Sequence, residues 1–309
     1  MKKDLLSLVE IKPEDIPYLV SEVARIKSSP ELYYSRLPHY SMLMLFEKPS
    51  TRTRASFEVG MYQLGGQAFY WGPQGTTLEN GKESIEDFAR VISGFYKIIM
   101  ARMYNQGTIE KLAEYSSIPV INGLTDTFHP CQVLSDILTI NEKKGELKGL
   151  KFTYVGDGNN NVTHDLLLGC SAAGINISVA CPKGYEPQQR ILKIAEKKSR
   201  WYNSKVEVVN DAKSAVENAD IVYADSWMSY HIPTKENEQR VADLTPFKVT
   251  TELLQLAKKD VIFMHCLPAD RKYEVTAEVI DGPQSVVFEQ AENRLHMQKA
   301  IILWLLGKL

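Results

Sequence analysis

Phe46-Glu47-Lys48-Pro49-Ser50-Thr51-Arg52-Thr53-Arg54 joins an apolar run to a segment whose apolar residues have helical spacing. The apolar run from Tyr40 to Phe46 predicts a buried strand, and Pro49 marks its end. Ser50 is a good N-cap for the helix that follows, which carries apolar residues at helical spacing and stops at Gly65-Gly66. The stretch therefore predicts a strand, a short turn and the N-terminus of a helix.

The same N-terminus has the composition of an anion site. Ser50, Thr51 and Thr53 supply hydroxyls, and Arg52 and Arg54 supply guanidinium groups beside backbone N–H groups that lack a helical partner. The helix dipole favours an anion, and an arginine can bind a phosphate through two parallel hydrogen bonds. The alternative is a capped helix with surface arginines, and these residues alone leave it open.

The composition is that of an ordinary globular protein. Of the 309 residues, 44% are hydrophobic and 24% are charged, and this length is enough for two domains. The net charge of −2 gives no broad basic surface for nucleic acid. No apolar run is long enough to span a membrane, and the first residues lack the apolar core of a signal peptide.

The cysteines argue against a structural metal or a disulfide framework, because no C-x-x-C pair occurs. Scattered cysteines fit a reducing compartment, and we expect a cytoplasmic protein. The four are Cys131, Cys170, Cys181 and Cys266.

Strand-like and helix-like segments alternate along the chain, which predicts an α/β protein with mostly parallel sheets flanked by helices. The polar segment 142–146 separates two such series. We expect one domain over residues 1–145, joined by the C-terminal helix at about 290–309, and a second over 146–289. Ligands of such sheets bind beyond the carboxyl ends of the strands, so we expect the active site in the cleft between the domains.

Polar groups follow several of the predicted strands. Arg102 stands at a strand end, and His129 and Gln132 lie in a His-Pro-Cys-Gln segment whose imidazole and amide can donate to a developing oxyanion. Asp225 follows another strand and can pair with a substrate ammonium or simply cap a helix. Cys266 follows the strand 261–264, and no base partner for thiolate attack is visible in the sequence.

Two glycine-containing segments do not carry nucleotide-binding motifs. Gly156-Asp157-Gly158 follows a strand, but the third glycine of the dinucleotide fingerprint is missing and no acidic residue ends the next strand. Gly81-Lys82-Glu83 is not a P-loop, because no serine or threonine follows the lysine. A nicotinamide-dependent oxidoreductase is therefore disfavoured.

Together these segments resemble the aspartate/ornithine carbamoyltransferase family. The family signatures Ser-Thr-Arg-Thr-Arg, His-Pro-Cys-Gln, Gly-Asp-x-x-Asn-Asn, Asp-x-Trp-x-Ser, His-Cys-Leu-Pro and Gln-Ala-Glu-Asn-Arg occur in family order between Phe46 and Arg294. The resemblance implies a carbamoyl-phosphate site, an ornithine site and a catalytic set. The first comprises Ser50, Thr51, Arg52, Thr53, Arg102, His129, Gln132, Cys266, Leu267 and Arg294; the second Asn161, Asp225, Ser229 and Tyr230; the third Arg102, His129, Cys266 and Arg294.

The resemblance also implies the reaction. The carbamoyl group of carbamoyl phosphate passes to the side-chain amine of L-ornithine, which gives L-citrulline and phosphate, with no metal or organic cofactor. It implies a homotrimer or an assembly of trimers, with no nucleic-acid or membrane partner.

Two departures from the family pattern keep alternatives open. Tyr230-His231 replaces the Met-Gly of the ornithine branch on the loop that closes over the amino acid. Leu78 stands where a glutamine often reaches the neighbouring subunit, so that contact is either lost or supplied by Lys82 or another loop residue. The alternatives are a carbamoyltransferase for another amine, such as putrescine, and a non-catalytic relative that binds carbamoyl phosphate.

Overall fold

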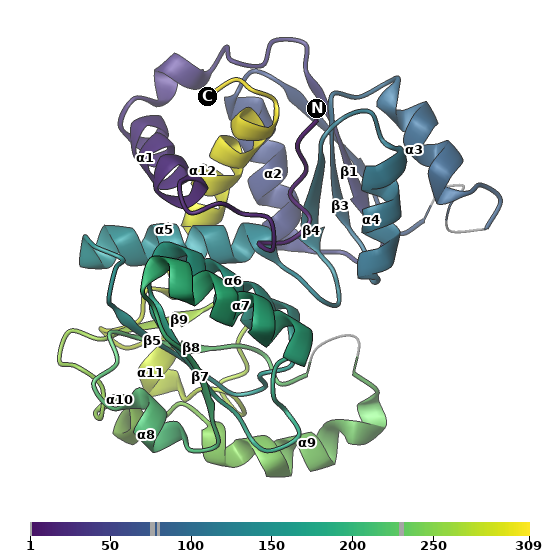
Figure 1. Ribbon diagram of the computed structural model, residues 1–309. Helices are drawn as coiled ribbons and strands as arrows, with labels where there is room; N and C mark the ends of the chain where they lie inside the picture. The colour runs from purple at the N-terminus through teal and green to yellow at the C-terminus, as the bar shows by residue number, and fades with distance from the viewer. Residues whose placement is uncertain (1, 75–77, 79–80, 229–231) are drawn as a thin grey trace. The chain divides into compact units, whose positions relative to one another are not determined.

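The computed structural model describes residues 2–74, 78, 81–228 and 232–309. The chain forms two compact units, each with its own parallel sheet (Figure 1). Unit 1 comprises Met1–Glu10, Glu14–Leu134 and Asn293–Leu309; unit 2 comprises Ile11–Pro13 and Ser135–Glu292.

Unit 1 is built on a four-stranded parallel sheet in the order β2-β1-β3-β4. The chain moves from β1 outward to β2, then returns to the other side of β1 for β3, so the strand order reverses between β1 and β3. Such a switch point leaves a crevice at the carboxyl ends of the two strands. The strands are β1 (Ser41–Phe46), β2 (Gln67–Trp71), β3 (Ile98–Arg102) and β4 (Val120–Leu124).

The helices of unit 1 bury alternate residues of this sheet. Leu43 and Leu45 of β1 and Ile99 of β3 pack in one cluster with Phe88 of α3 and Leu112 of α4. Successive side chains of a strand point to opposite faces, so these residues define the face that α3 and α4 cover. The helices are α1 (Asp15–Ser28), α2 (Thr51–Gln63), α3 (Ile85–Ser93), α4 (Gln106–Tyr115), the first residues of α5 (Pro130–Lys144) and, from Asn293 on, α12 (Val287–Leu305).

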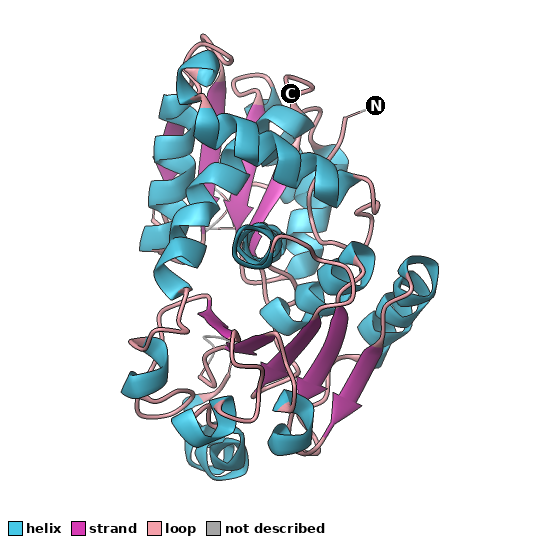
Figure 2. Cartoon of the chain, turned by 90° about the vertical axis from the view of Figure 1, so that its left-hand side faces the viewer, coloured by secondary structure: helices cyan, strands magenta, loops and turns pink. Residues whose placement is uncertain are grey.

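Unit 2 contains a five-stranded parallel sheet in the order β7-β6-β5-β8-β9, whose switch point lies between β5 and β8. Figure 2 shows the strands side by side with helices packed around them. The strands are β5 (Lys151–Val155), β6 (Asn176–Ala180), β7 (Val206–Val209), β8 (Ile221–Ala224) and β9 (Ile262–His265). The helices are α6 (Asn161–Ala173), α7 (Gln189–Tyr202), α8 (Ala212–Val216), α9 (Asn237–Leu244), α10 (Thr251–Leu254) and α11 (Ala277–Ile280).

The predicted α/β class with two parallel sheets is confirmed, and the differences lie at element ends. The last helix, α12 (Val287–Leu305), begins three residues before the predicted start at about residue 290. Val286 and Val287 look strand-like, but only Ser285 bridges to Phe263, and the helix begins directly afterwards. Among the described residues, none of the helices has the length and apolarity needed to cross a membrane.

Candidate substrate-binding sites

The helix predicted after Pro49 begins at the switch point of unit 1. Ser50 has extended backbone angles and caps α2, because its Oγ accepts a hydrogen bond from Thr53 N at 3.4 Å. The same hydroxyl donates to Thr53 Oγ1 at 3.1 Å. Thr51 and Arg52 are the first two residues of α2, so their backbone N–H groups belong to the first turn, which makes no hydrogen bonds within the helix. This local structure places the helix dipole and several donors at the end of β1.

Thr53 is the point where arginine side chains from two other elements meet. Arg102 ends β3, pairs with Phe46 of β1, and donates from Nη1 to Thr53 Oγ1 at 3.5 Å. Arg294 of α12 donates to the same oxygen from Nη2 at 3.5 Å and to Gln132 Oε1 from Nη1 at 2.7 Å. Segments that are distant in sequence thus bring two guanidinium groups, a hydroxyl and an amide together.

His129 lies beside these arginines and is only 5% exposed. Burial lowers its pKa well below the usual value, and the charges of Arg294, Arg102 and Arg52 lower it further. The imidazole is therefore neutral at physiological pH and able to donate one hydrogen bond to a carbonyl oxygen.

The positive charge of this region extends to Lys48, a residue that sequence reasoning did not select. Burial, and then the charge of Arg102, lower the pKa of the Lys48 ammonium. Cations that raise one another's electrostatic energy are compensated when an anion binds among them. The arrangement therefore suits a phosphate-bearing ligand with a carbonyl group next to the phosphate.

The predicted acceptor residues of unit 2 begin at the end of β5. Asn160 caps α6, since its Oδ1 accepts from Thr163 N at 2.8 Å, and its Nδ2 donates to Tyr154 OH at 2.7 Å. Asn161 is the first residue of α6 and is buried. The loop is thus held by its own side chains, which fixes the direction of the helix start.

Asp225 follows β8, on the other side of the switch point, and touches Cys266 after β9. The buried Asp225 Oδ1 accepts from Ser226 N at 2.7 Å and from Cys266 Sγ at 3.0 Å. Burial raises the pKa of the Asp225 carboxyl. The carboxylate and the thiol sulfur offer hydrogen-bond acceptors to an amine ligand, since the S–H itself is donated to Asp225.

His265 precedes Cys266 in the chain, and both nitrogens of its ring have neighbours that hold it in place. Its Nδ1 accepts from Leu267 N at 2.9 Å, and its Nε2 lies 3.5 Å from the buried Glu274 Oε1. Among the described residues, Asp225, His265 and Cys266 present ligand atoms within 4.8 Å of one another. A metal ion bound there through Nδ1 would have to displace the hydrogen bond from Leu267.

Some predicted residues lie outside the described part of the chain or outside these clusters. Ser229, Tyr230 and His231 belong to the residues that the structure does not describe. Leu78 packs against the core of unit 1 and lines a cavity of about 450 Å³ with Phe46 and other apolar residues.

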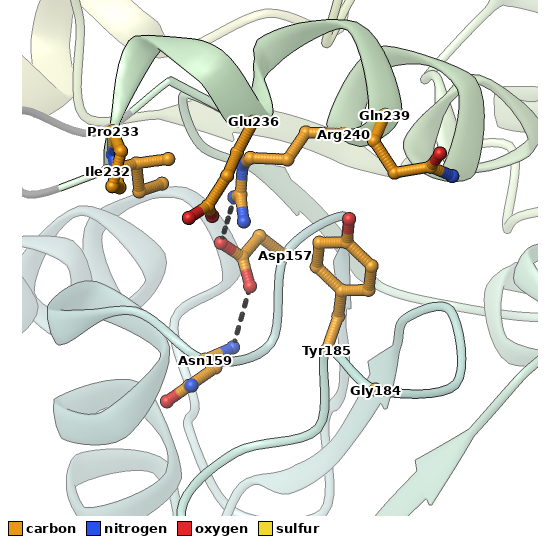
Figure 3. Close-up of a pocket in the computed structure, with 9 residues that line it drawn as sticks. All are labelled: Asp157, Asn159, Gly184, Tyr185, Ile232, Pro233, Glu236, Gln239 and Arg240. Atoms are coloured by element: carbon orange, nitrogen blue, oxygen red, sulfur yellow. Dashed lines mark hydrogen bonds and ion pairs between the residues drawn. The ribbon is translucent and has the colours of Figure 1, made fainter.

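Sequence reasoning missed the ion pair between Asp157 and Arg240. Figure 3 shows it in a pocket of about 450 Å³ in unit 2, where Arg240 reaches from α9 to the carboxylate of Asp157. Arg240 stands in a polar helix, fifteen positions after Asp225 in the chain, and the sequence around it gives no signal of burial.

The comparisons with known proteins define the class first. Residues 3–142 match the carbamoyl-P binding domain of the aspartate/ornithine carbamoyltransferases, and residues 148–305 match the Asp/Orn binding domain. The chain belongs to the aspartate/ornithine carbamoyltransferase family.

Full-length relatives narrow the class. An ornithine carbamoyltransferase from Caldicellulosiruptor saccharolyticus is 47% identical over 99% of this chain and 100% of its own length. One from Bacillus subtilis is 46% identical over 99% of this chain and 94% of its own. The chain is also similar to the solved structure of ornithine carbamoyltransferase from Pyrococcus furiosus. The two are 44% identical, the match covers 100% of this chain and 98% of the solved chain, and the TM-score is 0.95.

Proposed function

We propose that the protein is an ornithine carbamoyltransferase, which transfers the carbamoyl group of carbamoyl phosphate to the side-chain amine of L-ornithine and releases L-citrulline and phosphate. The observation that carries the proposal is the convergence of Ser50, Arg102 and Arg294 on Thr53 beside a neutral His129. The full-length likeness to ornithine carbamoyltransferases supports the same activity.

Residues 1–145 with the C-terminal helix bind carbamoyl phosphate in this proposal. The first turn of α2, with Ser50, Thr51, Arg52 and Thr53, holds the phosphate through backbone N–H groups, hydroxyls and a guanidinium. This first turn of α2 suits an anion because of the helix dipole and the neighbouring cations. The carbamoyl oxygen lies among further donors, which are Thr53, Arg102, His129, Gln132 and Arg294.

Residues 146–289 bind ornithine. Asn161 and Asp225, together with Ser229 and Tyr230, hold the amino-acid end of the substrate. Cys266 and Leu267 lie next to the reacting groups, and the contact of Cys266 with Asp225 supports this placement. Cys266 serves here to orient the amine rather than as a nucleophile.

The reaction then follows from positioning and charge stabilisation. The neutral amine attacks the carbamoyl carbon, a C–N bond forms, and the carbonyl oxygen becomes an oxyanion facing the donors around Thr53. The C–O bond to phosphate breaks as the carbonyl re-forms, and an amine proton leaves with the phosphate. Because His129 is neutral, it stabilises the oxyanion as a hydrogen-bond donor without having to lose a charge.

The test is phosphate release from carbamoyl phosphate by the purified protein with ornithine, putrescine, lysine or aspartate as acceptor. We expect strong preference for ornithine. Preference for putrescine would retain the carbamoyl-phosphate site and overturn the acceptor, and the change at Tyr230-His231 is the sequence feature that motivates this arm. No turnover with any amine would favour a non-catalytic relative.

We further propose a cytoplasmic homotrimer or an assembly of trimers, which the likeness to the family supports. Sedimentation equilibrium should give a mass of about three times the chain mass of 35.0 kDa, or a multiple of it. A monomer at micromolar concentration would contradict this proposal.

A further inference from the structure

Arg240 is a buried arginine with three hydrogen bonds to two loops, and Figure 3 shows the one to Asp157. It lies on α9 and is 9% exposed. Its Nε and Nη2 both donate to the carbonyl oxygen of Trp227, at 3.0 and 2.8 Å. Nη2 also donates to Asp157 Oδ2, which makes a buried ion pair with a carboxylate that is 3% exposed.

The two residues that accept hydrogen bonds from Arg240 belong to the two loops at the switch point of the sheet in unit 2. Asp157 follows β5 and begins the segment that leads to Asn161, and Trp227 lies two residues after Asp225. The loops also touch directly, because a Cβ on Gly156 would lie 3.3 Å from Trp227 Nε1. Arg240 therefore connects the segment that leads to Asn161 with the segment that carries Asp225, and these are the two described residues proposed to bind ornithine.

The other side chains around Arg240 favour one position of its guanidinium. Asp157 Oδ1 accepts from Asn159 N at 2.9 Å, which orients the carboxylate toward the arginine. The guanidinium carbon lies 5.1 Å from the ring centroid of Tyr185, and Tyr185 OH donates to Asp243 Oδ2 at 3.0 Å. A planar fork that serves a carboxylate and a carbonyl together cannot be copied by a lysine ammonium.

We propose that Arg240 is a positioning residue for the amino-acid substrate: it fixes the spacing between the Asn161 segment and the Asp225 segment, and so sets the affinity for ornithine. The inference rests on the proposed function, because it assigns a role in that same acceptor site. Arg240 does not itself need to touch the substrate, and the carbamoyl-phosphate residues of unit 1 are independent of it.

Misplacement of binding groups by about 1 Å can cost roughly a hundredfold in rate. For R240Q we therefore expect the KM for ornithine to rise about a hundredfold. For R240K, which keeps the charge opposite Asp157 but loses the fork, we expect a rise of about tenfold. The KM for carbamoyl phosphate should stay within about twofold of wild type in both variants, since the anion site is untouched.

Two control variants separate positioning from general loss of stability. R271Q removes the same side chain from an exposed ion pair with Asp281 in unit 2, where the bonds measure 2.6 and 2.9 Å. I191A opens a cavity at a fully buried position of α7, outside both loop segments, and lowers stability. Both should keep the wild-type KM for ornithine in the folded fraction.

Steady-state kinetics with both substrates, together with thermal unfolding of each variant, give the decision. A selective rise in the ornithine KM of R240K, larger in R240Q and absent from the controls, supports the inference. R240Q that fails to fold leaves the decision to R240K. A folded R240K with the wild-type KM, an R240K that does not fold, or a proportional change in both KM values overturns it. Wild-type protein that does not use ornithine would instead overturn the proposed function.

Discussion

The two units use the same position in their sheets for opposite chemistry. In each, polar side chains follow the two strands that flank the switch point, β1 and β3 in unit 1 and β5 and β8 in unit 2, and in unit 2 Cys266 joins them from the end of the neighbouring strand β9. Unit 1 gathers donors and cations there, among them Arg102, whereas unit 2 gathers the carboxylate of Asp225 and the thiol of Cys266. The fold thus dictates where ligands bind, and the loop residues decide whether the ligand is an anion or an amine.

The two sites are also held in different ways. In unit 1 the ligand groups hold one another through Thr53, so an incoming anion replaces contacts that are already polar. In unit 2 the acceptor loops are held from behind, by the buried pair of Asp157 and Arg240. We therefore expect substitutions in unit 1 to abolish binding of the anion directly. Substitutions behind the loops of unit 2 should instead lower the affinity for the amine ligand gradually.

The largest expected effect is that of R52A. Loss of one charged donor to the phosphate should lower kcat/KM at least about 10³-fold, because donors that face developing charge contribute several kcal/mol. The thermal stabilisation of the free protein by inorganic phosphate should disappear as well. R54A is the matched control, since Arg54 lies on the same helix, pairs with Glu58 and is exposed. Wild-type activity in R52A would contradict the phosphate role.

D225N tests the opposite half of the comparison. The substitution keeps the shape of a buried side chain and removes its charge, so we expect kcat/KM for ornithine to fall by about 10²-fold. Stabilisation by inorganic phosphate should persist, because the anion site belongs to the other unit. Loss of the phosphate response in D225N would show that the two sites are not independent.

Much of this fold could be predicted from local sequence. Apolar runs and caps were sufficient for β1 and α2, because Ser50 and the glycines after the helix act within a few residues. Strand order was not predictable, since it depends on which helix covers which face. The resemblance to the family predicted that Arg102 and Arg294 belong to a site, but the sequence did not predict that both reach Thr53.

The site residues behind the loops were the ones that sequence reasoning missed. Asp157 was considered only as part of a glycine motif, and Arg240 stands in a helix rich in polar residues. The burial of either depends on contacts between segments far apart in the chain. A charged residue that is buried only through tertiary contacts has no local pattern by which to find it.

Cys266 should produce an effect of intermediate size. We expect C266A to lower kcat about tenfold, because a thiol is a weak donor and its loss leaves Asp225 one contact short. Iodoacetamide should inactivate the wild type faster than it reduces the residual activity of C266A, since Cys266 is half-buried and the other three cysteines are buried. C170A is the control: burial raises the pKa of the Cys170 thiol, which keeps it unreactive. Equal inactivation of wild type and C266A would contradict this.

The smallest effect distinguishes the two sites by pH. Because the pKa of His129 is lowered in the folded protein, the unfolded chain binds the extra proton below about pH 6.5, and stability is lost as the pH falls. The free energy of unfolding, measured with urea between pH 7.5 and 5.5, should fall more steeply with decreasing pH in the wild type than in H129N, by up to about 1.4 kcal/mol per pH unit. Burial raises the pKa of Asp225, so this carboxyl acts in the opposite direction: it favours the folded state increasingly as the pH falls through its folded pKa toward about 3.8. Equal slopes for wild type and H129N would show that the imidazole is not held neutral, and the oxyanion role proposed for it would fail with that result.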